Sequence, residues 1–344
     1  MNLSKILSNY KPSFWEAGKD LFIHSVISLS SLYATWYYRT SYLSVLTVPL
    51  LGLMNVRTFV VFHDCGHNSY TPSKRLNYVL GSILGTLVFT PFCWSYDHHN
   101  HHLTTGNKEN TLSHNYNENI FHTLKEYKRM HPYLRTAYKI VKHPLVFGVP
   151  VASFYFVIVG RLSVFIHKLL DLKPYTQTLS RILYDTTLTN IGIYILLKTC
   201  IRYGIVYHYL LAALCGQIIG FFLFHNQHTF NPAYVVGNDT WNKVDSGLRG
   251  SSFIQVPWFL RYFMNGIEYH HIHHMSSSIP GYKIHKVHNE LVQHSEFKEK
   301  LSTITTLTMT ECFHNLWLTL YDEDKGMYST FEETDKEADK DKDK

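Results

Sequence analysis

The chain has 344 residues, of which 45% are hydrophobic and 15% aromatic, and its formal net charge at pH 7 is a modest +6. Its basic residues are scattered, which argues against a nucleic-acid surface. Its five cysteines include no Cys-x-x-Cys pair, which argues against a zinc knuckle or a disulfide framework. The mean hydropathy of −0.12 hides a strong segregation of apolar stretches from stretches rich in His and Lys.

Four apolar runs approach the length of about 20 residues that a helix needs to cross a bilayer. They form two consecutive pairs, each predicted to be a hairpin: residues 21–40 with 42–62, and residues 187–202 with 204–224. Residues 77–95 are broken by two glycines and Pro91, so we expect them to dip into the membrane and return. Residues 144–166 are expected to lie at the membrane interface.

Four histidine clusters stand among these runs. They are His63-Asp-Cys-Gly-His67, His98-His-Asn-His101-His102, His225-Asn-Gln-His228 and His270-His-Ile-His273-His274. Imidazoles at positions i, i+3 and i+4 share one side of a helix, where one metal ion can collect them. With 23 His in the chain, chance predicts His-x-x-His-His roughly 0.1 times, and the pattern occurs twice. If both hairpins go in and come back, all clusters emerge on one side of the bilayer, in a polar cap made from about 63–143 and 225–320.

The clusters supply enough imidazoles for two metal ions with four or five nitrogens each. The nine well-spaced candidates are His63, His67, His98, His101, His102, His228, His270, His273 and His274. Imidazole suits iron, zinc, copper and nickel alike, so ligand type alone does not identify the metal. No His-Glu-x-x-His occurs, which excludes a zincin protease. A two-metal site at the ends of apolar helices indicates oxygen chemistry on a hydrophobic substrate, because iron activates dioxygen whereas zinc has no redox chemistry.

Other residues near the clusters have weaker predicted roles. His99 and His271 lie off the helical register, so we expect them to be surface or outer groups rather than ligands. For His225, a hydrogen bond to a neighbour is as plausible as a metal bond. Asp64 either orients an imidazole or acts as a local cap.

The motifs resemble those of the membrane fatty acid desaturases. FTPFCWSYDHHNHHLTTGN, FHNQHTF, GLRGSSF, GIEYHHIHHMSSSIPGYKI and LYDEDKG are similar to the bacterial acyl-lipid desaturases, and the resemblance covers about residues 55–325. It implies a non-haem di-iron centre with two ligands from the first box, three from the second, three from the third and His228 from the Gln-His element. The implied reaction uses dioxygen and two electrons to remove two hydrogens from adjacent methylenes, leaving a cis double bond and water. Trp94 and Tyr96 then either line the acyl path or belong to the core.

The resemblance also implies the partners. The substrate is an acyl lipid or an acyl-CoA, membrane lipid surrounds the protein, and no nucleic acid is involved. Electrons come from a ferredoxin or from a b-type cytochrome with its reductase. No His-Pro-Gly-Gly signature of a fused cytochrome is present, so we expect a separate donor protein.

We therefore expect an all-α integral membrane protein with four transmembrane helices in two hairpins and a cytosolic cap that holds a di-iron site. Residues 1–325 form the desaturase domain, and the charged residues 326–344 are expected to be a disordered tail. The protein would be multi-pass, in the endoplasmic reticulum membrane of a eukaryotic cell or the inner membrane of a bacterium.

Two alternative functions remain at this stage. A membrane fatty acid hydroxylase or a carotenoid ketolase would use the same scaffold. A metal-transporting membrane protein is less favoured, because transporters carry ionisable ligands within their spans, whereas nearly all histidines here lie beyond the apolar runs.

Overall fold

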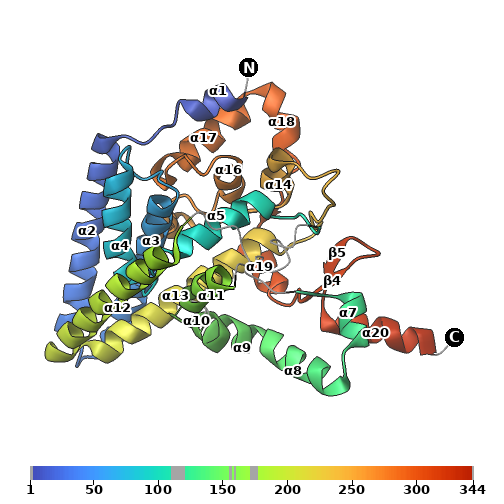
Figure 1. Ribbon diagram of the computed structural model, residues 1–344, viewed down its shortest axis with the longest axis horizontal. Coiled ribbons are helices and arrows are strands. Elements are labelled where there is room, and N and C mark those ends of the chain that lie inside the picture. Colours follow the sequence, from blue (N-terminus) through green and yellow to red (C-terminus); the bar gives the residue numbers. More distant parts are fainter. Residues whose placement is uncertain (1–2, 110–120, 155–156, 159, 171–176, 343–344) are drawn as a thin grey trace.

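The computed structural model describes residues 3–109, 121–154, 157–158, 160–170 and 177–342 (Figure 1). Most described residues are helical. The four long helices are α2 (Phe14–Tyr37), α3 (Ser44–Gly66), α12 (Leu179–Arg202) and α13 (Val206–His228). The other elements of the N-terminal half are α1 (Leu3–Ser8), α4 (Lys74–Leu87), α5 (Trp94–Thr104), α7 (Leu124–Arg129), α8 (Pro132–Lys142), α9 (Pro144–Val146), the π-helical turn η1 (Phe147–Val151), α10 (Ala152–Phe154) and α11 (Gly160–Leu169). Those of the C-terminal half are α14 (Lys243–Arg249), the 3-10 turn η3 (Trp258–Leu260), α15 (Arg261–Met264), α16 (His270–Met275), α17 (Gly281–Gln293), α18 (Ser295–Leu301), α19 (Met309–Asn315) and α20 (Phe331–Lys342).

Short strands depart from the all-α expectation. They are β1 (His122–Thr123), β2 (Phe253–Ile254), β3 (Thr306–Leu307), β4 (Leu320–Asp322) and β5 (Met327–Ser329). β4 pairs in parallel with β1 and antiparallel with β5, and β2 pairs in parallel with β3. The pairings of β1 with β4 and of β2 with β3 join segments far apart in the sequence, so no local pattern predicts them.

Among the described residues, α3 and α13 are long and apolar enough to cross a membrane. α2 and α12 are equally long, at 24 residues each, but more polar. The expected four-span topology therefore stays a prediction. Residues 144–166 form several short helical pieces in their described part rather than one continuous helix.

The two hairpins turn at the same end of the molecule. A Cβ atom at Gly204, between α12 and α13, would lie 3.7 Å from Nε of Arg39, which follows α2. Nearby, Val48 and Leu51 of α3 belong to the same buried apolar cluster as Tyr209 of α13. The opposite ends of α3 and α13, where two of the histidine clusters stand, consequently point the same way, as expected.

α3 and α13 cross in close contact. A Cβ atom at Gly52 would lie 2.8 Å from Cβ of Cys215, and one at Gly216 would lie 3.0 Å from the carbonyl oxygen of Gly52. Small residues at such a crossing let two helix backbones approach each other. The crossing therefore requires glycine at both positions.

Residues 77–95 form most of α4, a turn and the start of α5, and their expected dip into the membrane stays a prediction. α4 packs beside α3, the chain turns back near Pro91, and α5 returns toward the end of α3 (Figure 1). Phe92 of this turn packs against Tyr78 at a ring separation of 5.0 Å. A Cβ atom at Gly81 would lie 2.5 Å from the Phe92 ring, so glycine allows the turn to pack there.

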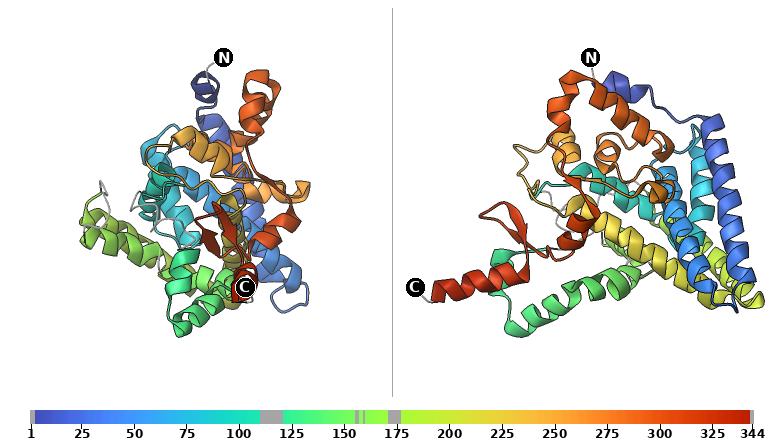
Figure 2. Two further views of the ribbon diagram at one scale, coloured as in Figure 1. Left: turned by 90° about the vertical axis from the view of Figure 1, so that its right-hand side faces the viewer. Right: turned by 180° about the vertical axis from the view of Figure 1, so that it is seen from behind.

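The C-terminal segment contains regular secondary structure up to residue 342, and the expected division into a domain of 1–325 and a disordered tail stays a prediction. Residues 327–342 form β5 and α20, and α20 extends beside α7 and α8 at the edge of the molecule (Figures 1 and 2). The Phe331 ring packs against Tyr127 at 5.4 Å. Thr330 and Glu333 exchange side-chain-to-backbone hydrogen bonds of 3.1 and 2.9 Å, which caps the helix start. One aromatic contact and a capping box thus connect the start of α20 to α7 and fix its first turn.

Candidate metal centre

Nine histidines from α3, α5, α13 and α16 meet in two groups. The first group contains His63, His67, His98, His102 and His273. The second contains His101, His228, His270 and His274. Within each group the candidate ligand atoms all lie within 4.8 Å of one another. All nine residues singled out from the sequence are thus brought together.

Two short helices divide their imidazoles between the groups. α5 directs His98 and His102, one helical turn apart, into the first group and His101 into the second. α16 does the reverse, because His270 and His274 enter the second group and His273 enters the first. The groups are adjacent, as the rings of His102 and His274 lie 4.2 Å apart.

The separations between nitrogens fit a metal coordination sphere. Nε2 of His63 lies 2.8 Å from Nε2 of His98, and Nε2 of His228 lies 3.0 Å from Nε2 of both His101 and His270. Metal–imidazole bonds of about 2.1 Å place two ligands at right angles about 3.0 Å apart. The structure therefore has two places where a metal ion fits the donor atoms present.

A hydrogen bond selects the tautomer of His228. Its Nδ1 lies 2.8 Å from the carbonyl oxygen of Gly250, which only accepts, so Nδ1 carries the proton. The lone pair of a neutral ring then lies on Nε2, which faces the other imidazoles. A backbone carbonyl that fixes the ring in this way is typical of metal-binding histidines.

Burial keeps these side chains in the form that binds metals. Desolvation, followed by the charges of neighbouring imidazoles, lowers the pKa of His98, His102 and His273 well below the ordinary value. They are consequently neutral at neutral pH. Metal ions bind the neutral imidazole, so no proton has to be displaced.

Asp64 lies next to His63, on the side of the imidazole ring that carries Nδ1. Its Oδ1 lies 3.5 Å from Nδ1 of His63, and its Oδ2 accepts a 2.7 Å hydrogen bond from the backbone N–H of Gly281. Both oxygens are buried with their side chain. The placement suits the orienting role considered for Asp64, and it also ties α3 to the start of α17.

The remaining histidines of the clusters lie outside both groups. Nε2 of His225 lies 2.8 Å from the carbonyl oxygen of Asn315 in α19, and Nε2 of His271 lies 3.1 Å from Nδ1 of His288 in α17. His99 is exposed. The structure therefore resolves His225 in favour of a hydrogen bond to a neighbour.

An apolar pocket runs between α3 and α13 and reaches His63. Its cavity volume is about 50 Å³. Its walls include Phe59, Leu223, Phe224 and Ile267. Sequence reasoning did not single out these residues, because apolar residues within an apolar run carry no distinguishing signal.

Trp94 and Tyr96 are not among the residues that line this pocket. The Trp94 ring stacks on His98 at 4.6 Å. The Tyr96 hydroxyl donates a 2.9 Å hydrogen bond to Asp185. Both belong to the support of α5 rather than to the pocket wall.

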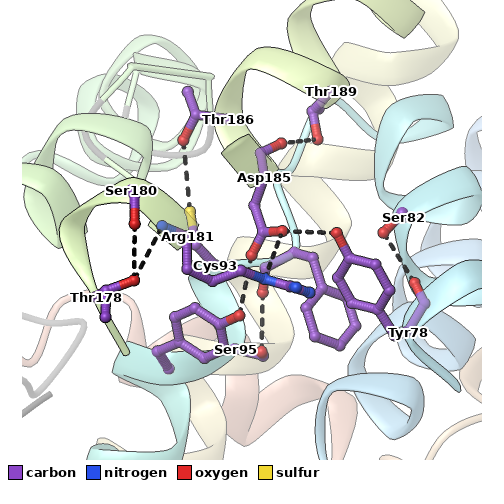
Figure 3. A network of polar contacts seen from close by, with 12 residues as sticks. Tyr78, Ser82, Cys93, Ser95, Thr178, Ser180, Arg181, Asp185, Thr186 and Thr189 are labelled. Carbon is purple, nitrogen blue, oxygen red and sulfur yellow. Dashed lines mark hydrogen bonds and ion pairs between the residues drawn. The ribbon is translucent and has the colours of Figure 1, made fainter. Parts of the chain in front are cut away.

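Asp185 connects α12 to the helices of the centre (Figure 3). Its buried carboxylate also accepts a 2.7 Å hydrogen bond from the hydroxyl of Tyr78 in α4, and Nε of Arg181 lies 3.2 Å away. It is the only acidic residue in 179–202. A single acidic residue in a largely apolar helix indicates that its side chain has a specific polar partner, because a buried carboxylate needs pairing.

The amino-acid sequence of this chain is similar to those of known proteins. The family model described as fatty acid desaturase matches residues 40–306. A fatty acid desaturase of Bacillus subtilis is 30% identical over 291 residues, which cover 83% of this chain and 76% of that protein.

Two further relatives match over shorter stretches. An sn-1 acyl-lipid omega-3 desaturase (ferredoxin) of Nostoc is 36% identical over 94 residues, 27% of this chain and 26% of that protein. An endoplasmic reticulum omega-3 fatty acid desaturase of Vigna radiata is 31% identical over 93 residues, 26% of this chain and 23% of that protein. Because the family match runs through both apolar helices and all nine clustered histidines, the chain belongs to the fatty acid desaturase family, whose members are membrane-associated oxidoreductases of lipid metabolism.

Proposed function

We propose that this protein introduces a cis double bond into a glycerolipid-linked acyl chain, using dioxygen, two electrons and two non-haem irons held by the nine clustered histidines. One observation carries the proposal: an apolar pocket reaches His63, which belongs to one of two adjacent imidazole groups of metal-binding geometry. When bound, iron supplies the oxidant that breaking an unactivated C–H bond requires.

The protein's own side chains have two tasks in this reaction. The nine imidazoles hold the metals, five in the first group and four in the second. Phe59, Leu223 and Phe224 line the pocket below His63. They would hold a saturated chain against the centre and exclude water that quenches a strong oxidant.

Relatives and composition support the choice of substrate and donor. The Nostoc relative is named as an acyl-lipid desaturase and its name includes ferredoxin. The pocket is lined largely by residues of α3 and α13, the two helices long and apolar enough to cross a membrane, which suits a chain esterified in a membrane lipid. We therefore favour an acyl lipid over acyl-CoA, and a separate ferredoxin or b-type cytochrome with its reductase as donor.

We also infer that α2 and α12 cross the membrane beside α3 and α13. Both carry large apolar side chains that face outward, among them Phe22 (70% exposed) and Leu29 on α2, and Ile191 and Tyr194 (64% exposed) on α12. Contiguous exposed apolar surface of this kind is unfavourable in water and suits lipid. With four spans in two hairpins, the histidine groups all lie on one side of the membrane, and we propose that this is the cytosolic side of the inner membrane or endoplasmic reticulum membrane.

The test is expression in a bacterial host of defined fatty acid content, followed by gas chromatography and mass spectrometry of its lipids. We expect a new alkene with the wild type and none with His101→Ala. His99→Ala is the matched control and should keep the activity, because His99 is exposed and outside both groups. Purified wild type should contain two irons per chain.

Two other outcomes would support a different function. An oxygenated product without a new alkene would identify a hydroxylase or ketolase. One zinc per chain, with no iron and no dioxygen-dependent product, would favour metal transport.

A further inference from the structure

The pocket that reaches His63 extends along α3 and α13 as far as Asn55, Ala213 and Gly216. α3 and α13 touch where Gly52 faces Gly216, and they separate toward the histidine groups. A Cβ atom at Gly216 would lie 3.0 Å from Cβ of Asn55 as well. The helix crossing therefore limits the space beside Asn55, at the end of the pocket away from the metal centre.

Asn55 places a polar group at this end. It stands eight residues before His63 on α3, which corresponds to about 12 Å along the helix axis. Its side chain is 9% exposed and lines the pocket, and its Nδ2 has no hydrogen-bond partner among the described residues. A terminal methyl group cannot pair with this amide and would exclude the water that can, so deeper entry of an acyl chain is disfavoured.

Whereas Asn55 limits the depth of the pocket, Gly220 leaves space in it. It lines the pocket one helical turn nearer to the histidines than Gly216. A Cβ atom at Gly220 would meet no atom within 4 Å, whereas one at Gly216 would meet the facing helix. The missing side chain at Gly220 thus keeps space open between the helix crossing and the histidines.

We propose that Asn55 and Gly220 set how far an acyl chain extends past the metal centre, and so select chains by the length of the segment beyond the reacting carbons. The proposal rests on the proposed desaturase function and adds a specificity determinant to it. Asn55 limits the depth of the pocket, and Gly220 keeps that depth accessible.

The test measures the fraction of each acyl chain converted when the full-length protein is expressed in a host fed saturated fatty acids of several lengths. Gly220→Leu should shorten the pocket and lower the conversion of the longest chains relative to the shortest, about tenfold for each carbon that no longer fits. Asn55→Ala should shift conversion toward longer chains. The matched control is Leu211→Phe, which adds bulk on α13 at an exposed position that does not line the pocket and should leave the profile unchanged.

Iron content and unfolding temperature show whether each variant folds. Asn55→Ala removes no hydrogen bond found among the described residues, so it should fold; if Gly220→Leu loses iron, Gly220→Ala and Asn55→Ala decide the question. Variants that hold wild-type iron and keep the wild-type length profile would overturn the inference and leave the desaturase function standing. A wild type that forms no double bond would instead refute the function itself.

Discussion

The Asp64 carboxylate accepts a 2.7 Å hydrogen bond from the backbone N–H of Gly281, 217 positions further along the chain. Its other oxygen faces Nδ1 of His63 at 3.5 Å. One buried carboxylate thus connects the end of α3, the first histidine group and the start of α17. A Cβ atom at Gly281 would lie 2.3 Å from the carbonyl oxygen of Asn265, so the backbone at Gly281 has little room to move away.

The substitution Asp64→Asn affects these two contacts differently. Asp64→Asn keeps an oxygen for the Gly281 N–H and removes the negative charge beside His63. Loss of such an outer partner typically weakens metal binding about 10–100-fold, and we expect a fall of this size in iron affinity, with little change in the unfolding temperature of the iron-free protein. Iron retained against a graded series of chelator concentrations measures it. Wild-type affinity in Asp64→Asn would show that the carboxylate does not support His63.

Asp185 should contribute to stability rather than to chemistry. Asp185→Ala leaves the hydroxyls of Tyr78 and Tyr96 without their shared acceptor. A hydrogen bond to a charged group contributes about 1.5–3 kcal/mol, so we expect a clear drop in the unfolding temperature in detergent and a smaller one for Asp185→Asn. The control is Asp239→Ala, at an exposed aspartate. Equal unfolding temperatures for the Asp185→Ala and Asp239→Ala variants would contradict the role of the network in holding α12.

Lys142 should make stability depend on pH. Its side chain is 4% exposed, its Nζ lies 3.8 Å from the centre of the Phe147 ring, and burial lowers its pKa to about 7. The unfolded chain, with a lysine pKa of about 10.4, therefore binds a proton that the folded chain has released between these two values. The free energy of unfolding should rise with pH across that window, and Lys142→Met should lack this part of the rise.

Unfolding temperatures of the wild type and Lys142→Met at about pH 7 and about pH 9.5 test this dependence. Lys128→Met, at an exposed lysine, is the control and should keep the wild-type slope. If Lys142→Met also keeps it, the aromatic contact compensates fully for the burial of the ammonium group.

The membrane topology makes a separate prediction. Ser41 lies in the turn between α2 and α3, and Asp239 lies in the cap before α14. Ser41→Cys should react with a membrane-impermeant maleimide added to intact cells, whereas Asp239→Cys should react only after the cells are opened. Four of the five native cysteines are buried, so background labelling should be low. Labelling of both positions from the same side would exclude the two-hairpin arrangement.

Spacing within a helix predicted which histidines gather, because positions one turn apart share a face. Spacing did not predict how the histidines divide between the two groups. His101 and His102 are neighbours in the sequence but enter different groups, since that depends on how α5 lies relative to α16. Likewise, His225 and His228 stand on the same helix, and only the position of α19 shows that His225 contacts a backbone carbonyl.

Contacts between distant segments also explain why the strands, the position of α20 and the pocket were not predicted from the sequence. Two of the three strand pairings, β1 with β4 and β2 with β3, join distant segments, so no local pattern predicts them. The contact of Phe331 with Tyr127 likewise places the start of α20 against α7, which composition does not reveal. The pocket depends on where α3 and α13 separate, and Asn55 carries no pattern that marks it as part of a cavity wall.

α5 and α16 each present imidazoles to both groups, in opposite proportions. An ion bound in either group would hold both helices in the orientation that the other group needs, so the first ion taken up prepares the site for the second. Titration of metal-free protein with ferrous iron should accordingly saturate in one sigmoidal step at two equivalents, and half-loaded molecules should be scarce in a partly filled sample.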